Sequence, residues 1–448
     1  MPKVVRILLP LILLCAAAGA AYWFWPKKVA ARPNIILLSI DTLRADRVGA
    51  YGYNRPTTPF IDSLAKESVV FRNTVTAAPW TLPSHVTMFT GLYPTSHGVV
   101  QAHDKISKDL PLLAEILKRA GYKTAAFTGG GYVSAGYGFS RGFSTFVQNR
   151  HLASDGFDFG NTVERAEELL KSRGDDKRPY FIFLHTYDVH CPYAVPEKYQ
   201  QLFKSSADYI DPGHCGEDYY NKLSLTESQG KYLADQYDGS IRAVDDTLSG
   251  FVKFLETQPD YDNTILIITS DHGEEFLEHG LVGHQHSLYR ALLMVPLIMH
   301  VPGVAPKEVH GSVSLVDLFP TVLDLAGAPI PGAIDGASLK PYLEEGDELA
   351  PKRNFQIVST DRGQSMRSLI SDDAHLIVSN DDGSKLLFDV KNDPLEHNNT
   401  CATDQQRCER LHEALLKAFN ATHQNAAKNK ESIGDENIEQ LKSLGYMK

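Results

Sequence analysis

Apolar runs as long as a β-strand alternate with amphipathic helical patterns over most of this chain, and this alternation restricts the folds open to it. It favours a layered α/β structure around a largely parallel sheet, because each helix carries the chain back before the next strand begins. In the longest helical pattern, Tyr237, Ile241, Val244 and Leu248 recur every three or four residues, as on a helix with one buried face. The predicted strands are 35–40, 124–128, 180–185, 264–269 and 295–300, and the predicted helices are 58–67, 110–119, 162–172, 227–256 and 313–325.

The rhythm changes beyond about residue 345. Four short strand-like runs follow one another there without intervening helices, and a helical pattern comes after them. The runs lie at 355–359, 365–370, 375–378 and 386–390, and the helical pattern lies at 405–419. Strands joined by short turns pair in antiparallel fashion, so we predict a small C-terminal antiparallel sheet with one helix against it.

These changes of pattern divide the chain into four parts. We expect an N-terminal segment, a large α/β domain, the small antiparallel subdomain and a polar, loosely held tail. Their predicted bounds are 1–32, 33–345, 346–425 and 426–448.

The N-terminal segment has the pattern of an exported protein. Cationic residues precede an uncharged apolar run, Ile7–Trp25, which ends in an aromatic cluster followed by Lys27 and Lys28. A helix over this run is long enough for a bilayer at about 1.5 Å per residue, and flanking tryptophan and lysine are typical of interfacial anchors. Small residues at 16–21 also offer signal-peptide cleavage sites. We favour a retained transmembrane anchor, and in either case we expect the rest of the chain in the periplasm or on the cell surface.

Cysteine usage agrees with export. Cys15 lies in the apolar run, and the four remaining cysteines could close two disulfides in an oxidising compartment. Their spacing favours Cys191 with Cys215 and Cys401 with Cys408, although four cysteines permit three pairings.

The overall charge argues against one class of partner. The formal net charge is -11 and no long basic tract is present, so we expect no nucleic-acid partner. A small anionic substrate is not excluded, because local groups decide its capture.

Polar residues with catalytic potential follow several predicted strands and open one helix. In an open α/β sheet, sites form where the carboxyl ends of the strands meet. Taken alone, each residue could be a turn or capping residue, but together they predict a site at one sheet edge. They are Asp41 after the first strand, Asp271 and His272 after the strand at 264–269, His185, Asp188 and His190 after a third, and Thr81 where Pro83 favours a helix start.

The grouping suggests a reaction. Asp41, Asp271 and His272 could hold a divalent cation, with the Thr81 hydroxyl as a further oxygen ligand. A threonine hydroxyl is a poor nucleophile unless a metal or a base activates it, and helix N–H groups next to Thr81 would favour an anionic group. We therefore predict attack on a phosphate or sulfate ester with a covalent Thr81 intermediate. His85, one helical turn beyond Thr81, is predicted to touch the substrate's oxygens.

At this point five segments together resemble the sulfatase family of the alkaline phosphatase superfamily. They are PNIILLSIDTLRADRVGAYGYNRPTTPFIDSLAKESVVFRN, TLPSHVTMFTGLYPTSHGV, SDHGEEFLEHG, GHQHSLYRALLMVPLIMHVPG and LLFDVKNDPLEHNN, in order over roughly residues 33–400. The resemblance implies an alkaline-phosphatase-like three-layer α/β sandwich with a mixed sheet of about eight to ten strands. It also implies a small C-terminal antiparallel α+β subdomain.

The active residue departs from the family pattern. The family carries Cys or Ser, converted to formylglycine, in a C/S-x-P-S-R motif, and this chain has Thr81-Leu-Pro-Ser-His85. Thr42 replaces a second aspartate, and His272 replaces an asparagine. These residues resemble the threonine-based metal site of phosphodiesterases and of phosphoglycerol and phosphoethanolamine transferases. An imidazole in place of an amide oxygen also favours zinc or manganese over calcium.

The resemblance also implies roles for other histidines. His190 matches a residue of the substrate pocket, and either His284 or His286 matches a cationic position near the leaving group. Asp188 with neighbouring histidines could hold a second metal, but without a clean spacing, so we predict one divalent metal ion.

Three functions remain open from the sequence. The leading hypothesis is an exported, metal-dependent hydrolase or transferase of phosphate monoesters or diesters that acts through Thr81. The second is a sulfatase that works without formylglycine. The third is a catalytically inactive binding protein that keeps the fold.

Overall fold

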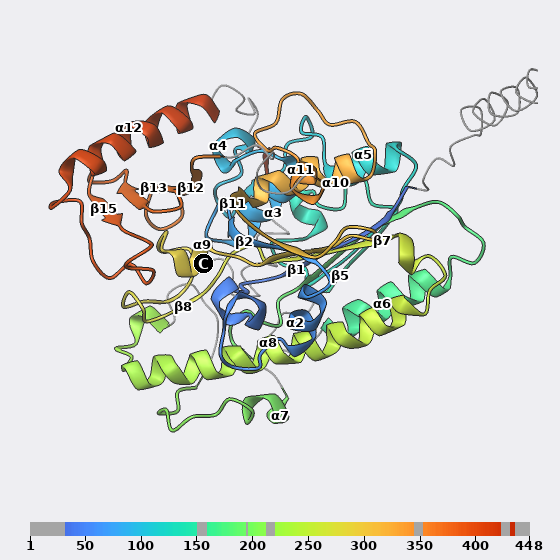
Figure 1. Ribbon diagram of the computed structural model, residues 1–448, viewed down its shortest axis with the longest axis horizontal. Helices are drawn as coiled ribbons and strands as arrows, with labels where there is room; N and C mark the ends of the chain where they lie inside the picture. The colour runs from blue at the N-terminus through green and yellow to red at the C-terminus, as the bar shows by residue number, and fades with distance from the viewer. Residues whose placement is uncertain are drawn as a thin grey trace, which may run out of the picture. The chain divides into compact units, whose positions relative to one another are not determined.

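An eight-stranded mixed sheet forms the centre of the molecule, with strands in the order β11-β2-β10-β7-β1-β6-β4-β5 (Figure 1). The computed structural model describes residues 32–149, 159–193, 196–211, 220–344, 353–422 and 431–434. From Pro33 onward the chain forms one compact unit. The predicted α/β class, with a large mixed sheet and a small antiparallel one, is confirmed.

The five predicted strands of the large sheet are all present, and three further strands of that sheet were missed. The predicted ones are β1 (Asn34–Ile40), β4 (Lys123–Thr128), β6 (Tyr180–Thr186), β7 (Thr264–Thr269) and β10 (Leu297–His300). The additional strands are β2 (Val69–Val75), β5 (Thr145–Gln148) and β11 (Lys307–Ser314). Strand β10 runs antiparallel to both of its neighbours, which makes the sheet mixed.

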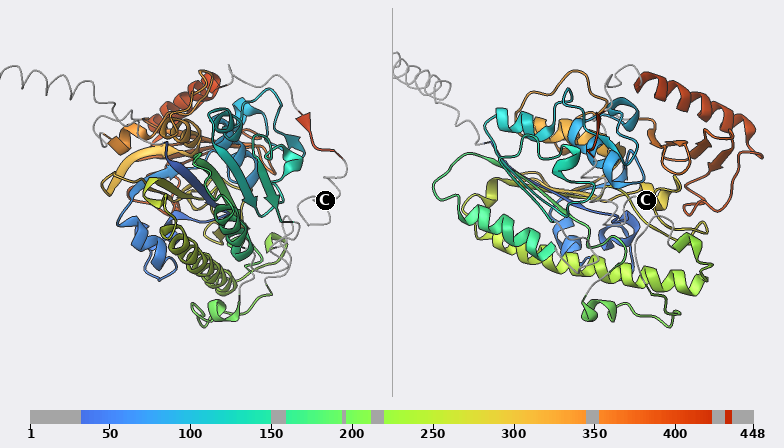
Figure 2. Two further views of the ribbon diagram at one scale, coloured as in Figure 1. Left: turned by 90° about the vertical axis from the view of Figure 1, so that its right-hand side faces the viewer. Right: turned by 180° about the vertical axis from the view of Figure 1, so that it is seen from behind.

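Helices cover both faces of the sheet (Figures 1 and 2). Alternate residues of β1 show the two layers: Ile35 and Leu37 belong to one core cluster, and Ile36 and Leu38 belong to the other. Both faces are therefore apolar, as expected of a covered, largely parallel sheet. The first layer contains α3 (Thr81–Thr90), α5 (Leu113–Arg119), α10 (Leu318–Leu325) and α11 (Lys340–Glu344), and the second contains α2 (Pro59–Ala65), α6 (Phe159–Lys171) and α8 (Glu227–Glu256).

Shorter elements complete the large domain. They are α4 (Pro94–His97), α7 (Glu197–Gln200), α9 (Arg290–Leu293), β3 (Asp104–Lys105), β8 (Glu275–Phe276) and β9 (Val282–Gly283).

One predicted helix begins later than expected. The pattern at 313–325 predicts a single helix, but Val313 and Ser314 end β11, and Leu315–Asp317 form a 3-10 turn before α10. The Asp317 carboxylate accepts a hydrogen bond from Ser314 N–H at 3.0 Å and forms an ion pair with Arg353 at 2.7 Å. This buried carboxylate stops the strand and starts the helical turn.

The small subdomain has the predicted form. Four antiparallel strands lie in the order β12-β13-β14-β15, and α12 (Gln405–Thr422) packs on them. The strand bounds are Gln356–Thr360, Met366–Ile370, His375–Ser379 and Lys385–Phe388. In Figure 1 this subdomain lies beside the end of the large sheet, and Ser359 N–H donates to the Ala77 carbonyl of the large domain at 3.3 Å.

Part of the C-terminal tail is docked rather than loose. Strand β16 (Glu431–Ser432) pairs with β3, and the side chain of Ile433 is buried in the core of the large domain. The apolar side chain that follows a two-residue strand thus holds this portion of the predicted polar tail.

The predicted membrane segment, Ile7–Trp25, lies outside the described residues. Among the helices that the structure describes, none combines the length and the apolarity that crossing a bilayer requires.

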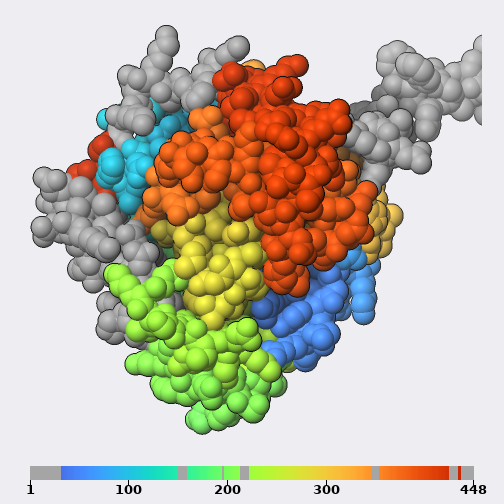
Figure 3. Space-filling view, turned by 90° about the vertical axis from the view of Figure 1, so that its left-hand side faces the viewer, coloured from blue at the N-terminus to red at the C-terminus, as the bar shows by residue number. Residues whose placement is uncertain are grey.

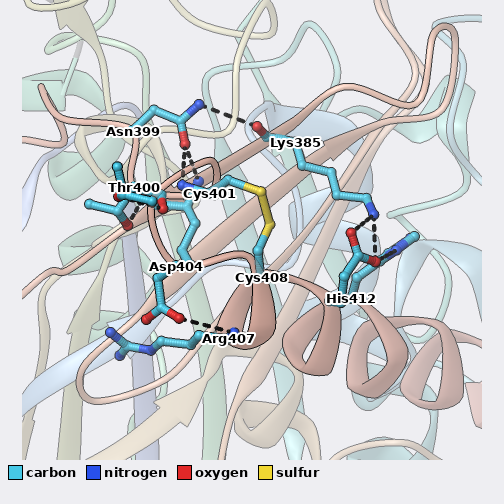
Figure 4. Close-up of a disulfide and its surroundings, with 11 residues drawn as sticks. Lys385, Asn399, Thr400, Cys401, Asp404, Arg407, Cys408 and His412 are labelled. Carbon is cyan, nitrogen blue, oxygen red and sulfur yellow. Dashed lines mark hydrogen bonds and ion pairs between the residues drawn. A yellow bond between two sulfur atoms is a disulfide. The ribbon is translucent and has the colours of Figure 1, made fainter.

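A disulfide joins Cys401 to Cys408, as predicted. It ties the loop before α12 to the first turns of that helix (Figure 4). In the same loop Asn399 Oδ1 accepts hydrogen bonds from Leu387 N–H and Cys401 N–H, both at 3.0 Å. Cys191 is also disulfide-bonded, whereas Cys215, its predicted partner, lies outside the described residues.

Replacing both Cys401 and Cys408 with serine should lower the free energy of unfolding of the subdomain by about 2 kcal/mol. The two cysteines are 7 residues apart, and closing so short a loop restricts the unfolded chain only modestly. Urea unfolding followed by circular dichroism measures the change. An unchanged midpoint would show that the loop is held without the disulfide.

Candidate active site

Neighbouring strands bring the candidate residues together. Asp41 directly follows β1, and Asp271 lies just beyond β7, which pairs with β1 in parallel. Strand β6 lies on the other side of β1 and contributes His185. The three polar side chains therefore gather at the carboxyl edge of adjacent strands, as the sequence predicts.

Thr81 reaches this edge as the first residue of α3. Trp80 before it is extended, with φ of -163°, and the helix runs from Thr81 to a left-handed Gly91. Every residue of α3 is buried. A fully buried helix gives Thr81 a rigid support.

The four predicted metal-site residues are within short distances of one another. Thr81 Oγ1 lies 3.3 Å from Asp41 Oδ2 and 3.4 Å from His272 Nε2. His272 Nε2 is also 3.3 Å from Asp271 Oδ2. Ligand atoms of Asp41, Asp271 and His272 all lie within 4.8 Å of one another, and all three side chains are buried.

The chemistry of this group fits a bound cation. Asp41 Oδ1 and Asp271 Oδ2 are buried and have no hydrogen-bond partner among the described residues. Burial and the neighbouring Asp271 carboxylate raise the pKa of Asp41 well above its usual value, because two unneutralised carboxylates are unfavourable in a buried site. A divalent ion would satisfy both oxygens and offset the repulsion.

A backbone hydrogen bond orients the His272 ring. Its Nδ1 lies 2.9 Å from the Gly273 carbonyl oxygen, which makes Nδ1 the protonated nitrogen. The lone pair of Nε2 is then directed toward Thr81 and the carboxylates, as a metal ligand requires. Burial lowers the pKa of His272 well below its usual value, which keeps the ring neutral.

His85 is held by contacts within the protein next to Thr81. Its ring is fully buried, with Nδ1 2.9 Å from the Thr81 carbonyl oxygen and Nε2 3.1 Å from Ser39 Oγ. Aromatic rings, including Phe183 and Phe139, pack against it edge-on. Its Nδ1 also lies 3.5 Å from Asp271 Oδ2 of the candidate metal site, and its predicted contact with the substrate stays a prediction.

The other predicted histidines lie in the loop regions around the site. The ring of His284 lies 4.4 Å from that of His272 and 5.0 Å from that of His190, measured between centroids. Burial lowers the pKa of His190 to about 4 and that of His284 to about 3. His286 binds Glu275 Oε2 through Nε2 at 2.9 Å and the His284 carbonyl oxygen through Nδ1 at 3.1 Å. Of the two alternatives His284 and His286, the first is therefore in contact with the candidate site.

Asp188, a candidate ligand for a second metal, is occupied elsewhere. Its Oδ2 accepts a hydrogen bond from Phe159 N–H at 2.8 Å. Within the described part of the chain, only Asp41, Asp271 and His272 form a cluster suited to a metal ion. This agrees with a single ion.

One residue near the site, Glu274, was not assigned from the sequence, whereas His185 was expected at this edge of the sheet. His185 accepts from Gly129 N–H through Nδ1 at 3.3 Å and directs Nε2 to Asp41 Oδ2 at 3.5 Å. Glu274 binds His284 Nδ1 through Oε1 at 2.9 Å. Glu274 could have been suspected, because a glutamate two residues after His272 in SDHGEE is expected at the same sheet edge.

The C-terminal subdomain holds the loop that carries these histidines. Glu275, which is buried, accepts hydrogen bonds from His279 at 2.6 Å and Ser287 at 2.7 Å, in addition to His286. His279 Nε2 also binds the Leu395 carbonyl oxygen at 3.0 Å. In Figure 3 the yellow segment, which includes this loop, lies directly against the orange-to-red subdomain above it. We call residues 274–290 the histidine loop.

Asp271→Asn should have opposite effects on stability and on metal binding. It removes one of two adjacent buried carboxylates, so the metal-free protein should become more stable, by on the order of 1–2 kcal/mol. The same change removes an anionic ligand and should weaken zinc or manganese binding by tenfold or more. Thermal unfolding with chelator and titration calorimetry with each metal measure the two effects. A fall in stability without metal would contradict the proposed repulsion.

His279→Gln should reveal a pH-dependent bond at the subdomain contact. The Glu275 carboxylate raises the pKa of His279 above its usual 6.5, and hydrogen bonds from the histidines lower the pKa of Glu275 from 4.5 to about 2. The stabilisation is therefore complete between about pH 4.5 and 6.5. It is lost as pH rises through the folded pKa of His279, and as pH falls toward 2. We expect a loss of about 2 kcal/mol at pH 6 that shrinks toward pH 9.

Thermal unfolding across that pH range measures the difference between His279→Gln and the wild type. His310, whose side chain is 69% exposed beside Glu308, provides the control: His310→Gln should follow the wild-type curve. A His279 effect that does not vary with pH would rule out the charged hydrogen bond.

Comparisons with known proteins agree with this geometry. The family model "Sulfatase" matches residues 33–328, and "N-sulphoglucosamine sulphohydrolase, C-terminal" matches residues 277–425. The multifunctional alkaline phosphatase superfamily protein PehA of Trinickia caryophylli is 26% identical, over 82% of this chain and 91% of PehA. The arylsulfatase of Clostridium perfringens is also 26% identical, over 86% and 94%.

A solved structure shows the same fold. The phosphonate monoester hydrolase of Agrobacterium radiobacter superposes with a TM-score of 0.73 at 22% identity, covering 88% of this chain and 96% of that one. Because the Sulfatase model covers most of the large domain, this chain belongs to the sulfatase family of the alkaline phosphatase superfamily.

Proposed function

We propose that this chain is a metal-dependent hydrolase of anionic esters, phosphate or sulfate, in which Thr81 is the nucleophile. The observation that carries the proposal is the position of the Thr81 hydroxyl, 3.3 Å from Asp41 Oδ2 and 3.4 Å from His272 Nε2. A threonine hydroxyl needs activation before it can attack an ester. The cluster of carboxylates and imidazole beside it offers that activation.

We propose that Asp41, Asp271 and His272 hold one divalent ion, with the Thr81 hydroxyl as a further ligand. Such an ion lowers the pKa of a bound hydroxyl and neutralises negative charge on a substrate oxygen. Two carboxylates with one neutral imidazole suit zinc or manganese better than calcium, which prefers oxygen ligands alone. The two carboxylate oxygens without a hydrogen-bond partner among the described residues support this assignment.

The residues of the chain would share the work as follows. The Thr81 oxygen forms a bond to phosphorus or sulfur and gives up its proton, the ester bond breaks, and the departing oxygen takes up a proton and leaves as an alcohol. The Leu82 N–H, at the start of α3, favours the anionic group under attack. His190 and His284 would contact the substrate's other oxygens or the leaving group. A second attack, by water, releases the group from Thr81; an alcohol in place of water would give transfer.

Two substrate classes are supported by different observations. Sulfate esters are favoured by the relatives, most of which are named as sulfatases, and this support is at least as strong as that for phosphate. Phosphate esters are favoured by the nucleophile, because a threonine ester can be released only by a second displacement, a step well established at phosphorus. The proposal is therefore limited to the hydrolysis of anionic esters, and a side-by-side assay on phosphate and sulfate esters decides between the two substrate classes.

We further propose that the enzyme works outside the cytoplasm. The Cys401–Cys408 disulfide supports an oxidising compartment, and the apolar run Ile7–Trp25 supports export or membrane anchoring. Protease treatment of intact cells that make the protein tests this placement.

Thr81→Ala should abolish turnover, with a loss of at least about 10³-fold, while Thr81→Ser should retain measurable activity. The wild type should be assayed side by side on 4-nitrophenyl phosphate, bis(4-nitrophenyl) phosphate and 4-nitrophenyl sulfate, with zinc or manganese. After acid quenching, intact mass should show a phosphate or sulfate increment that peptide mapping places on Thr81.

Control measurements separate catalysis from folding. Thr81→Ala should keep its thermal stability, because Thr81 makes only long contacts at its hydroxyl. Full activity of Thr81→Ala on every ester would refute the proposal. Substoichiometric metal, with no metal taken up from solution, would favour the inactive binding protein.

A further inference from the structure

Thr42, the residue after Asp41, has an unusual backbone conformation. Its φ is 60°, in the left-handed region. A β-branched residue rarely adopts this region, because its Cβ crowds the backbone there. The Thr42 hydroxyl is buried and has no hydrogen-bond partner among the described residues, so the side chain does not hold the conformation. Contacts of the backbone must hold it instead.

The N–H of Thr42 is bonded to the candidate metal site. It donates to Asp271 Oδ1 at 3.2 Å, and the His272 N–H donates to the same oxygen at 3.0 Å. The other oxygen, Asp271 Oδ2, lies 3.3 Å from His272 Nε2 and has no hydrogen-bond partner within the described part of the chain. The Thr42 N–H thus ties Asp271 to the residue that follows Asp41 and leaves Oδ2 for a cation.

The hydroxyl of Tyr237 holds the other end of Thr42. It donates to the Thr42 carbonyl oxygen at 2.7 Å and accepts from the Arg44 N–H at 2.9 Å. Tyr237 is buried on α8, and its ring packs against Phe276 with 5.0 Å between centroids. Burial raises the pKa of Tyr237 well above its usual value, so the hydroxyl keeps the proton that it donates. A residue of the long scaffold helix therefore fixes the loop after β1.

We propose that Tyr237 is a positioning residue for the metal site, and that its hydroxyl keeps Thr42 in the left-handed conformation that binds Asp271. The inference rests on the proposed function, because the paired carboxylates matter to the reaction only if they hold a cation. Asp41 and Asp271 repel each other, and a Thr42 released from its strain would let them separate. Tyr237 prevents this relaxation, so the ligands are in place before the ion binds.

The test measures the binding of zinc and of manganese to the full-length protein by titration calorimetry. Tyr237→Phe removes the hydroxyl and keeps the ring that packs on Phe276. The metal Kd should rise about tenfold or more, as expected for a group that orients metal ligands. Tyr122→Phe is the matched control. Tyr122 is also buried, and its hydroxyl donates to the Pro33 carbonyl oxygen at 3.0 Å, at the opposite end of β1. This variant should lose thermal stability and keep its metal Kd within about twofold of the wild type.

A second substitution tests the role of the backbone conformation. Glycine adopts a φ of 60° without strain, so Thr42→Gly should make the Tyr237 hydroxyl less necessary. In the Thr42→Gly background, Tyr237→Phe should raise the metal Kd by no more than about threefold. An equal rise in both backgrounds would show that Tyr237 does not act through Thr42, and would overturn the proposal.

Hydrogen exchange followed by mass spectrometry gives a readout that needs no metal. The N–H groups of Thr42 and Arg44 are bonded to Asp271 and Tyr237. In the metal-free protein, Tyr237→Phe should therefore speed exchange by about tenfold in the peptide that contains these two groups. Tyr122→Phe should leave exchange in that peptide unchanged.

The outcomes separate this inference from the proposed function. Unchanged exchange in Tyr237→Phe, or an unchanged Kd while the wild type binds metal, would overturn the positioning role alone. A wild type that binds neither zinc nor manganese, with full activity retained in Thr81→Ala, would overturn the proposed function and this inference with it.

Discussion

Electrostatic repulsion between two buried carboxylates is the main physical constraint on the candidate active site at the edge of the sheet. Asp41 and Asp271 project from neighbouring strands into the same buried space, and each keeps an oxygen without a hydrogen-bond partner among the described residues. Such an arrangement is costly unless a positive charge enters it. The remaining features of the site agree with a cation between these carboxylates. They are the orientation of His272, the position of Thr81 on a rigid helix and the contact of His185 with Asp41.

Much of the architecture could be predicted from the sequence, because strands buried on both faces consist of consecutive apolar residues. β1, β6 and β7 were visible in this way; Asp41 follows β1 directly, and Asp271 follows β7 after one residue. β2 and β11 were missed for a physical reason: they lie toward one edge of the sheet and include polar residues such as Arg72 and Lys307. Their pattern is therefore closer to that of a loop or the end of a helix.

Side-chain direction was the harder part of the site to predict. His85 lies one helical turn from Thr81, but spacing cannot tell which groups a buried ring will contact: the ring binds the Ser39 hydroxyl at 3.1 Å and lies 3.5 Å from the Asp271 carboxylate. Glu274 and Glu275 are both buried, but Glu274 binds His284 beside the site and Glu275 binds His279 and His286, a difference that only the folded loop reveals. The docked Ile433 likewise depends on a distant partner strand.

The contact between the C-terminal subdomain and the histidine loop has a consequence for how such enzymes can diversify. Glu396 accepts a hydrogen bond from the Arg290 N–H at 2.8 Å, and the Leu395 carbonyl accepts one from His279, so the histidine loop is held in place partly by residues more than a hundred positions later. Insertions or deletions in the hairpins of the small sheet would then shift the histidine loop without changing any residue of the candidate metal site. Substrate range can thus drift while the chemical centre stays unchanged.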